Sequence, residues 1–334
     1  MLDQNRSPLG FVTSGGLQPR DAVKCIQRAE TLGYTSAWMA EGHGGDQFAI
    51  LSAAAVQTST ITLGTCISSV FVRSAPTVAM AALTLDDLSN GRCILGLGSS
   101  HKVQVEPEHG VTFEKPTARL REYIEVVRRL AQHGQLQDMH GEAISIKTFD
   151  LWFKPHRESI PIYVAGIFPR MLEICGEISD GVLLTRTTLG NIEEKRAHIE
   201  AGAKRGGRAV NRVRVASLLP TYVAVSQQVA FDAMRPGLAF YAGFFPRYQR
   251  LLADAGFTDA AANIAAAWNR GEHDKAAALV PDELIDATCI AGTAEQCHQR
   301  ILEYRRAGLD EPIIGVHTDD QAQVETVLSA CAGA

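Results

Sequence analysis

The apolar positions of this chain fall into short continuous runs that alternate with stretches of helical spacing. The first run covers residues 9–14, and apolar residues at intervals of three and four then follow between Pro19 and Gly33. Short continuous apolar runs are typical of strands buried on both faces of a parallel sheet, whereas intervals of three and four are typical of amphipathic helices. The chain is therefore predicted to begin with a strand followed by a helix.

The same alternation continues to the end of the chain and predicts eight strands, each followed by a helix, at residues 9–14, 36–41, 61–68, 92–98, 162–166, 181–185, 213–225 and 313–316. Eight such units close into a (β/α)8 TIM barrel, so we predict a single α/β domain over residues 1–334. The regular pattern is interrupted at about 101–160 and 227–280, which we interpret as insertions after strands 4 and 7. The first insertion is predicted to contain a helix over about 117–132 and a hairpin around 143–149.

A doubly wound sheet is the alternative fold. It would prefer fewer strands and a phosphate-binding fingerprint at its first turn, where only Ser14, Gly15 and Gly16 stand. The pattern therefore favours the barrel.

Ligands of such barrels bind at the carboxyl ends of the strands, which here are the loops after Val12, Met39, Ile67, Leu97, Val164, Leu184, Pro220 and Val316. The loop after the fourth strand reads GLGSSH at 96–101. Its small side chains let a ligand lie against peptide N–H groups and hydroxyls; glycines that only let the strand turn are the alternative. The third glycine of a dinucleotide fingerprint is missing, so this loop does not predict a Rossmann site.

Composition narrows the classes of partner. The net charge of −5 gives no electrostatic reason to expect nucleic acid or an anionic membrane, so a small-molecule substrate is the expected partner. No apolar stretch reaches the ~18 residues of a membrane span, and residues 1–6 show no leader pattern, so the expected location is the cytoplasm. The seven cysteines form no C-x-x-C pair, which predicts reduced, mostly buried thiols and no zinc site.

Several side chains near the strand ends can carry chemistry. Glu41 ends a predicted buried strand, so its carboxylate must meet a partner or accept hydrogen bonds from a ligand or from the backbone. His43 and His101 lie in strand-end loops, where an imidazole can pass a proton near pH 7; a solvated loop histidine is the alternative. Arg73 and Arg186, after strands three and six, either hold an anionic tail or are surface charges.

Glu106, Glu108 and His109 are metal-ligand types, but their spacing matches no tetrahedral site. We interpret residues 106–110 as a solvated loop, and no metal is predicted.

Longer motifs give a resemblance over nearly the whole chain. They read WMAEGHGGD at 38–46, LGTCI at 63–67, LTLDDLSNGR at 83–92 leading into GLG at 96–98, KPTARLREY at 115–123 and AGT at 291–293. With them the chain resembles the luciferase-like monooxygenase superfamily of flavin and deazaflavin oxidoreductases. Within it, the chain is similar to the branch of methylene-tetrahydromethanopterin reductase, which uses coenzyme F420.

The resemblance implies a homodimeric barrel that binds the cofactor ring at its strand ends and a substrate above the ring. It implies a cis peptide bond between Cys66 and Ile67, in a bulge that presses against the ring. The implied cofactor-binding residues are Glu41, Cys66, Ile67, Gly98, Ser99, Ser100, Ala165, Gly166, Ile167 and Phe168. We also predict that Glu41 and His43 on one side and His101 on the other bracket the reactive end of the ring as catalytic residues, because their loops follow strands two and four on the same barrel face.

The chain departs from the family pattern at two positions. Gly42 replaces a histidine that usually follows the acid, and His101 stands where the sugar-phosphate dehydrogenases have an acidic residue, so a sugar phosphate is not the expected substrate. The expected activity is hydride transfer between coenzyme F420 and a small organic substrate, and an FMN-dependent monooxygenase is the alternative. A barrel that binds a ligand without catalysis is disfavoured by the polar residues Glu41, Ser99, Ser100 and His101.

Overall fold

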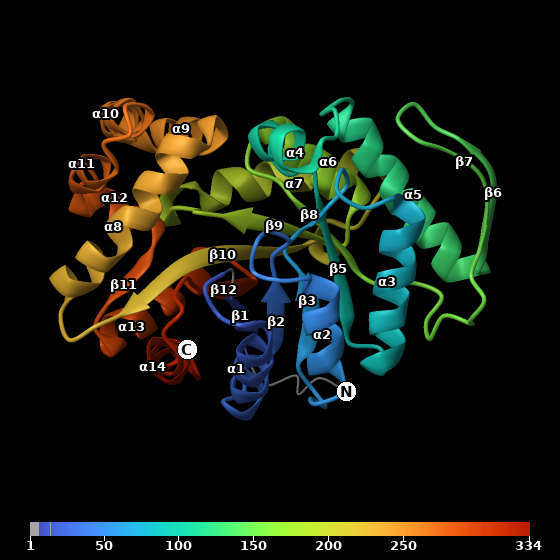
Figure 1. Ribbon diagram of the computed structural model, residues 1–334, viewed down its shortest axis with the longest axis horizontal. Coiled ribbons are helices and arrows are strands. Elements are labelled where there is room, and N and C mark those ends of the chain that lie inside the picture. The colour runs from blue at the N-terminus through green and yellow to red at the C-terminus, as the bar shows by residue number, and fades with distance from the viewer. Residues whose placement is uncertain (1–6, 14) are drawn as a thin grey trace.

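The strands of this protein close into a barrel. The computed structural model describes residues 7–13 and 15–334 (Figure 1), so the expectations for residues 1–6 and for Ser14 lie outside the described residues. All neighbours in the ring pair in parallel. The ring runs in the order β1 (Gly10–Thr13), β2 (Ser36–Met39), β3 (Thr62–Thr65), β5 (Cys93–Gly98), β8 (Ile162–Ala165), β9 (Gly181–Thr185), β10 (Arg214–Val223) and β12 (Glu311–Val316).

The predicted (β/α)8 barrel is confirmed. Pairing of β9 with β10, and of β12 with β1, leaves the ring without a free edge, which a doubly wound sheet would have. The helices outside the ring are α1 (Pro19–Thr31), α2 (Gln47–Ala55), α3 (Ala75–Leu88), α5 (Pro116–His133), α6 (Pro169–Ile178), α7 (Ile192–Arg205), α13 (Ala294–Arg306) and α14 (Gln321–Cys331). Short 3-10 turns, η1 (Leu189–Asn191) and η2 (Val210–Arg212), flank α7.

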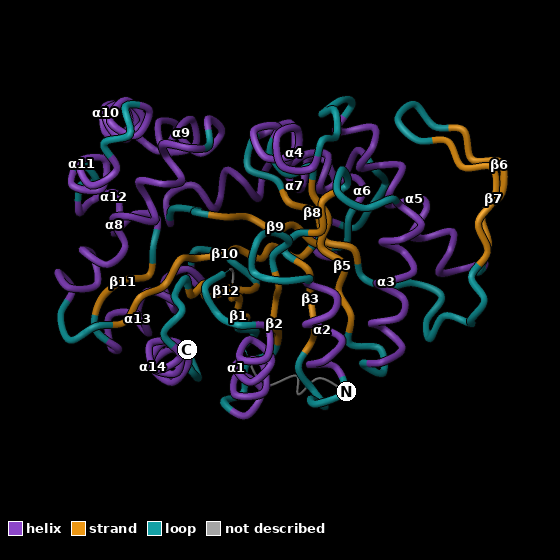
Figure 2. The backbone as a smooth tube through the Cα atoms, viewed as in Figure 1, coloured by secondary structure: helices purple, strands orange, loops and turns teal. Residues whose placement is uncertain are grey.

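The first insertion follows β5 and holds α4 (Lys102–His109), α5 and the hairpin of β6 (Gln135–His140) and β7 (Ser145–Asp150). The hairpin stands beside α5 at the edge of the molecule (Figure 2). Residues 106–109 were predicted to be loop, and this prediction is wrong, because they complete α4. Pro107 lies in the last turn, where its missing N–H removes only one helical hydrogen bond, and Gly110 ends the helix in the left-handed conformation.

The second insertion follows β10 and is mostly helical, as predicted. Its elements are α8 (Gln227–Phe244), α9 (Pro246–Leu252), the π-helical turn η3 (Ala253–Phe257), α10 (Thr258–Asn269), α11 (His273–Ala278), α12 (Asp282–Thr288) and the strand β11 (Ile290–Gly292). These helices share an apolar cluster of their own, around Leu238, Ile264 and Leu284. In Figure 1, α9 and α4 lie at the end of the barrel to which the arrow of β2 points. Both insertions therefore lie at the carboxyl ends of the strands, where His101 packs against Phe245.

The apolar core has two layers. The inner layer fills the barrel with Val12, Trp38, Tyr163, Leu183 and Ile313, and the larger outer layer lies between the strands and the helices. All seven cysteines are buried and free, as predicted. No helix in the described part of the chain combines the length and the apolar character that a membrane crossing requires.

Candidate active site

A cavity of about 1030 Å³ opens at the carboxyl ends of the barrel strands. Small-molecule sites in proteins commonly have volumes of about 300–1,000 Å³, so this cavity is large enough for a cofactor ring together with a substrate. Each of the eight ring strands contributes a residue at or near its carboxyl end to the wall of the cavity. Every predicted site residue lines it as well: Glu41, His43, Cys66, Ile67, Gly98, Ser99, Ser100, His101, Ala165, Gly166, Ile167 and Phe168.

One wall of the cavity is the bulge that follows β3. The Cys66–Ile67 peptide bond is cis, which confirms the prediction from the resemblance. The next two residues form β4 (Ser68–Ser69), which pairs with Leu97 and Gly98 at the end of β5. Gly98 packs so closely on the bulge that a Cβ atom there would lie 2.9 Å from Cγ1 of Ile67. The bulge and the glycine and serine loop therefore form one continuous surface.

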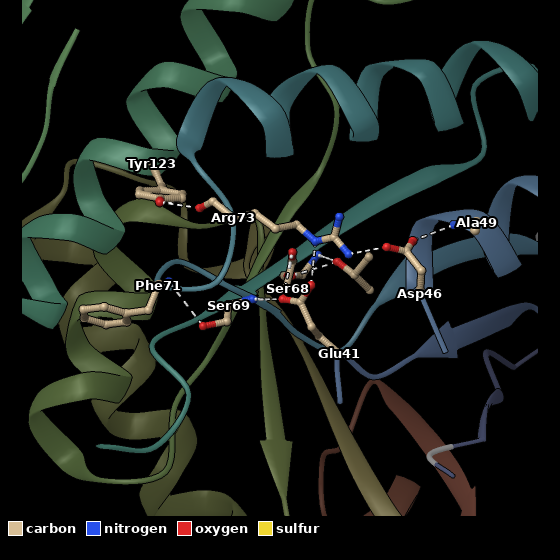
Figure 3. A network of polar contacts seen from close by, with 10 residues as sticks. Glu41, Asp46, Ala49, Ser68, Ser69, Phe71, Arg73 and Tyr123 are labelled. Atoms are coloured by element: carbon tan, nitrogen blue, oxygen red, sulfur yellow. Dashed lines mark hydrogen bonds and ion pairs between the residues drawn. The ribbon is translucent and has the colours of Figure 1, made fainter. Parts of the chain in front are cut away.

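Glu41 is held by polar contacts to the bulge rather than pointing freely into the cavity. Its carboxylate accepts hydrogen bonds from the backbone N–H of Ser69 at 2.7 Å and from Nε of Arg73 at 2.6 Å. Figure 3 shows Arg73 between Glu41 and Asp46, whose carboxylate accepts a hydrogen bond from Nη2 of Arg73 at 2.6 Å. Arg73 is thus neither a free surface charge nor available to an anionic tail. The Glu41 carboxylate links the end of β2 to the bulge, while its predicted catalytic role stays a prediction.

Replacing Arg73 with methionine should lower the free energy of unfolding by about 2 kcal/mol, because it leaves the Glu41 carboxylate, only 12% exposed, without its cation. Urea denaturation measures this loss. The control is Arg121→Met, which removes an ion pair with Glu177 whose side chains are 38% and 26% exposed, and should cost no more than about 1 kcal/mol. Equal losses in both variants would contradict the role of Arg73 in holding Glu41.

His43 lies at the rim of the cavity. Its side chain is 81% exposed, and Nε2 lies 3.3 Å from the carboxylate of Glu108 on α4. The two side chains span the rim between the loop after β2 and the first insertion. The carboxylate of Glu106 instead accepts a hydrogen bond from the backbone N–H of Phe113. Over residues 7–13 and 15–334, no group of three or more His, Cys, Asp or Glu is arranged to hold a metal ion.

His101 lies deeper and packs against aromatic rings of the second insertion. Its ring centroid is 4.7 Å from that of Phe245 and 5.3 Å from that of Tyr248. Burial, together with the charge of Arg247, lowers the pKa of His101 to about 4. The imidazole is therefore neutral at pH 7, with one N–H to donate and one nitrogen to accept.

Sequence reasoning missed two parts of the cavity. The first is its aromatic roof from α8 and α9, formed by Phe240, Tyr241, Phe244, Phe245 and Tyr248. The sequence feature that could have revealed this roof is a cluster of five aromatic residues within nine positions, in a chain that is only 7% aromatic. The second is His317, which directly follows β12 and so stands at a strand end. It lines the cavity, and desolvation together with the charge of Arg186 lowers its pKa to about 4.

His101 and His317 make the free energy of unfolding depend on pH. The pKa of each is about 4 in the folded protein and about 6.5 in an unfolded chain, so below pH 6.5 the unfolded state binds more protons. Stability from their neutral forms is therefore present above pH 6.5 and is lost as the pH falls toward 4. We expect the free energy of unfolding to fall from pH 7 to pH 5, with a share of about 1–2 kcal/mol from His101.

Urea denaturation of the native protein and of His101→Phe at pH 7 and pH 5 measures this share. The phenylalanine keeps a ring against Phe245 and Tyr248 but cannot titrate, so the variant should lose less stability than the native protein on acidification. An identical loss in the two proteins would show that His101 is not kept neutral by the fold.

Comparison with known proteins agrees with this geometry. Residues 3–311 match the model of the luciferase-like monooxygenase family. The chain is 30% identical over 296 residues to the 5,10-methylenetetrahydromethanopterin reductase of Archaeoglobus fulgidus, with 87% of each chain covered. It superposes with a TM-score of 0.86, at 27% identity, on the coenzyme F420-dependent tetrahydromethanopterin reductase of Methanopyrus kandleri, covering 97% of this chain and 98% of that one.

A more distant solved structure shares the fold alone. It is the oxygenating constituent of the FMN-containing 3,6-diketocamphane monooxygenase of Pseudomonas putida, with a TM-score of 0.71 at 16% identity and coverage of 98% of this chain and 97% of that one. Because the family model spans most of the sequence and agrees with the barrel and its strand-end cavity, this chain belongs to the luciferase-like monooxygenase family.

Proposed function

We propose that this chain is an F420-dependent oxidoreductase, which transfers a hydride between the deazaflavin coenzyme and a carbon centre of a small organic substrate. The observation that carries the proposal is the cavity wall formed by the Cys66–Ile67 bulge and the loop that follows Gly98. This wall occurs in a chain 30% identical to a methylenetetrahydromethanopterin reductase, so family and site point to the same chemistry.

The residues present fit such a cofactor. Ile67 offers an apolar surface to a flat ring, and Gly98, Ser99 and Ser100 offer backbone N–H groups and hydroxyls without bulk. The loop of residues 165–168 forms another part of the wall. Arg170, Arg247 and Arg250 are exposed where they line the cavity, and these cations suit an anionic cofactor tail.

When bound, the deazaflavin would supply or accept a hydride at its carbon C5, which replaces the reactive nitrogen of a flavin and discourages oxygen chemistry. The chain's own contribution is to position the reactants and to exclude water. The aromatic roof of α8 and α9 closes the cavity opposite the strand ends, and Glu41 holds the bulge through Ser69 and Arg73. Glu41 thus acts as a positioning residue.

His101 is the residue we assign to the charge that develops on the substrate. As a neutral imidazole it donates a hydrogen bond through its N–H to the substrate atom that gains negative charge during hydride transfer. His43, at the rim, pairs with Glu108 and is placed to order the loop after β2 over a bound ligand. Among the three predicted catalytic residues, His101 is therefore the one proposed to contact the substrate.

Equilibrium titration of the purified protein with coenzyme F420 and with FMN, side by side, tests the cofactor. Anaerobic mixing of enzyme, reduced F420 and candidate substrates should then restore the absorbance of the oxidised coenzyme. Tight FMN binding with oxygen-dependent turnover, and no binding of F420, would instead establish the monooxygenase alternative.

We also propose that the enzyme is a homodimer in the cytoplasm. Large apolar side chains are exposed on α3 and at the end of α2: Met80 is 42%, Leu88 43% and Val56 66% exposed. A second copy of the chain would remove such a surface from water. The seven free cysteines suit a reducing compartment. Light scattering coupled to gel filtration measures the dimer, and a monomer at micromolar concentration would contradict it.

A further inference from the structure

We propose that Arg186 binds a carboxylate of the substrate, so that the substrates of this enzyme are small organic acids. The inference rests on the proposed function, because it assigns the space beside the cofactor to the substrate. Arg186 directly follows β9 and lines the cavity, yet only 5% of its surface is exposed. Its φ of 47° turns the chain at the strand end, where its backbone N–H donates to the carbonyl of Leu218.

No carboxylate of the residues that the structure describes neutralises the charge of Arg186. Its Nη1 atom is buried and has no hydrogen-bond partner among the described residues, and none of their carboxylates forms an ion pair with it. Arg73, in the same end of the barrel, is held by two carboxylates. A buried guanidinium without an anion is costly, and an anionic ligand in the cavity would remove that cost.

The titratable groups that feel the charge of Arg186 are neutral at pH 7. Burial raises the pKa of Tyr248 to about 12 and raises the pKa of the Cys289 thiol, although the positive charge of Arg186 opposes both shifts. Burial and Arg186 together lower the pKa of His317 to about 4. Within the described residues, these three neighbours of Arg186 are therefore polar but not anionic, which leaves the negative charge to a ligand.

Contacts between rings connect Arg186 to the proposed catalytic residue. The guanidinium carbon lies 4.0 Å from the ring centroid of Tyr241, whose ring is 5.1 Å from that of Tyr248. Tyr248 in turn lies 5.3 Å from His101. A substrate whose carboxylate meets Arg186 can therefore present another part of itself to His101.

The position of Arg186 in the barrel separates its guanidinium from the predicted cofactor contacts. The predicted cofactor contacts come from the ends of β2, β3, β5 and β8, whereas Arg186 follows β9 under the roof helix α8. The exposed Arg170, Arg247 and Arg250 are better placed for an anionic tail that leaves the cavity. A single planar guanidinium matches the two oxygens of a carboxylate.

The test compares benzoate with benzamide, which have the same shape but differ in charge. Calorimetric titration of the F420-loaded protein should show benzoate binding about tenfold more tightly than benzamide. Arg186→Gln should abolish this preference and leave the affinity for benzamide unchanged. The matched control Arg129→Gln removes an exposed arginine on α5 and should keep the preference.

Equal binding of the two probes by the native protein, or a preference that survives Arg186→Gln, would overturn the proposal. Fluorescence titration should show that Arg186→Gln keeps its affinity for F420; a large loss there would reassign the arginine to the cofactor. Displacement of benzoate by equimolar inorganic phosphate would overturn the carboxylate as the preferred anion. If Arg186→Gln does not fold, Arg186→Met takes its place, because it fills similar space without a charge, and a preference for benzoate that survives in it overturns the proposal.

The same titrations run without cofactor keep the two hypotheses apart. Failure of the protein to bind F420 contradicts the proposed function alone, because the comparison of benzoate with benzamide still measures Arg186.

Discussion

Replacing His101 with alanine is expected to lower turnover roughly 10²- to 10³-fold with little change in cofactor affinity, because the change removes one hydrogen-bond donor from the site of charge development. The effect should appear in kcat rather than in KM. The measurement is single-turnover oxidation of reduced F420 under anaerobic conditions, with a substrate found by the mixing experiment. Cofactor affinity is measured separately by titration.

Two further variants divide the contributions of His101. Glutamine keeps an N–H donor and should recover part of the rate, whereas phenylalanine keeps only the packing against Phe245 and Tyr248 and should behave like alanine. Since the imidazole titrates near pH 4, the rate should also show no break near pH 6.5 from this residue. Unchanged turnover in His101→Ala would show that His101 only packs against the aromatic roof and does not act in hydride transfer.

The barrel and the strand-end residues could be predicted from the sequence because they depend on local patterns. Buried parallel strands read as continuous apolar runs, and a barrel brings all their carboxyl ends to one face, so residues as distant as Glu41 and Phe168 reach the same cavity. The capping box of Thr293 and Gln296 at the start of α13 is another feature that depends on a local pattern of residues.

What the sequence could not predict depends on contacts between distant segments. The sequence left open whether Arg186 is a surface charge or binds a ligand. The answer depends on the contact of its guanidinium with Tyr241, and Tyr241 lies in an insertion whose packing has no simple periodicity. The partners of Glu41 required the path of the chain from the bulge to Arg73. Residues 106–109 were misread because proline and glycine were taken to exclude a helix, although both are tolerated at its end.

Replacing Gly98 with valine should weaken F420 binding about 10- to 100-fold, because overpacking of a close contact costs about 1–3 kcal/mol. A Cβ at this position would lie 2.9 Å from Cγ1 of Ile67 and 3.3 Å from Cβ of Ala165, which belong to two predicted cofactor contacts. The clash can be relieved only by moving the Ile67 side chain or the end of β8 at Ala165. Either movement changes the surface on which the ring is proposed to lie.

Fluorescence titration of F420 against Gly98→Val, Gly98→Ala and Gly237→Ala gives a graded test. Alanine adds one carbon against the movable end of Ile67, so its loss of affinity should be smaller than that of valine. Gly237, exposed on α8, has no atom within 4 Å of an added Cβ, so Gly237→Ala should bind F420 as the native protein does. If Gly98→Val binds F420 normally and unfolds at the same temperature as the native protein, the ring does not rest on the surface shared by the bulge and Gly98.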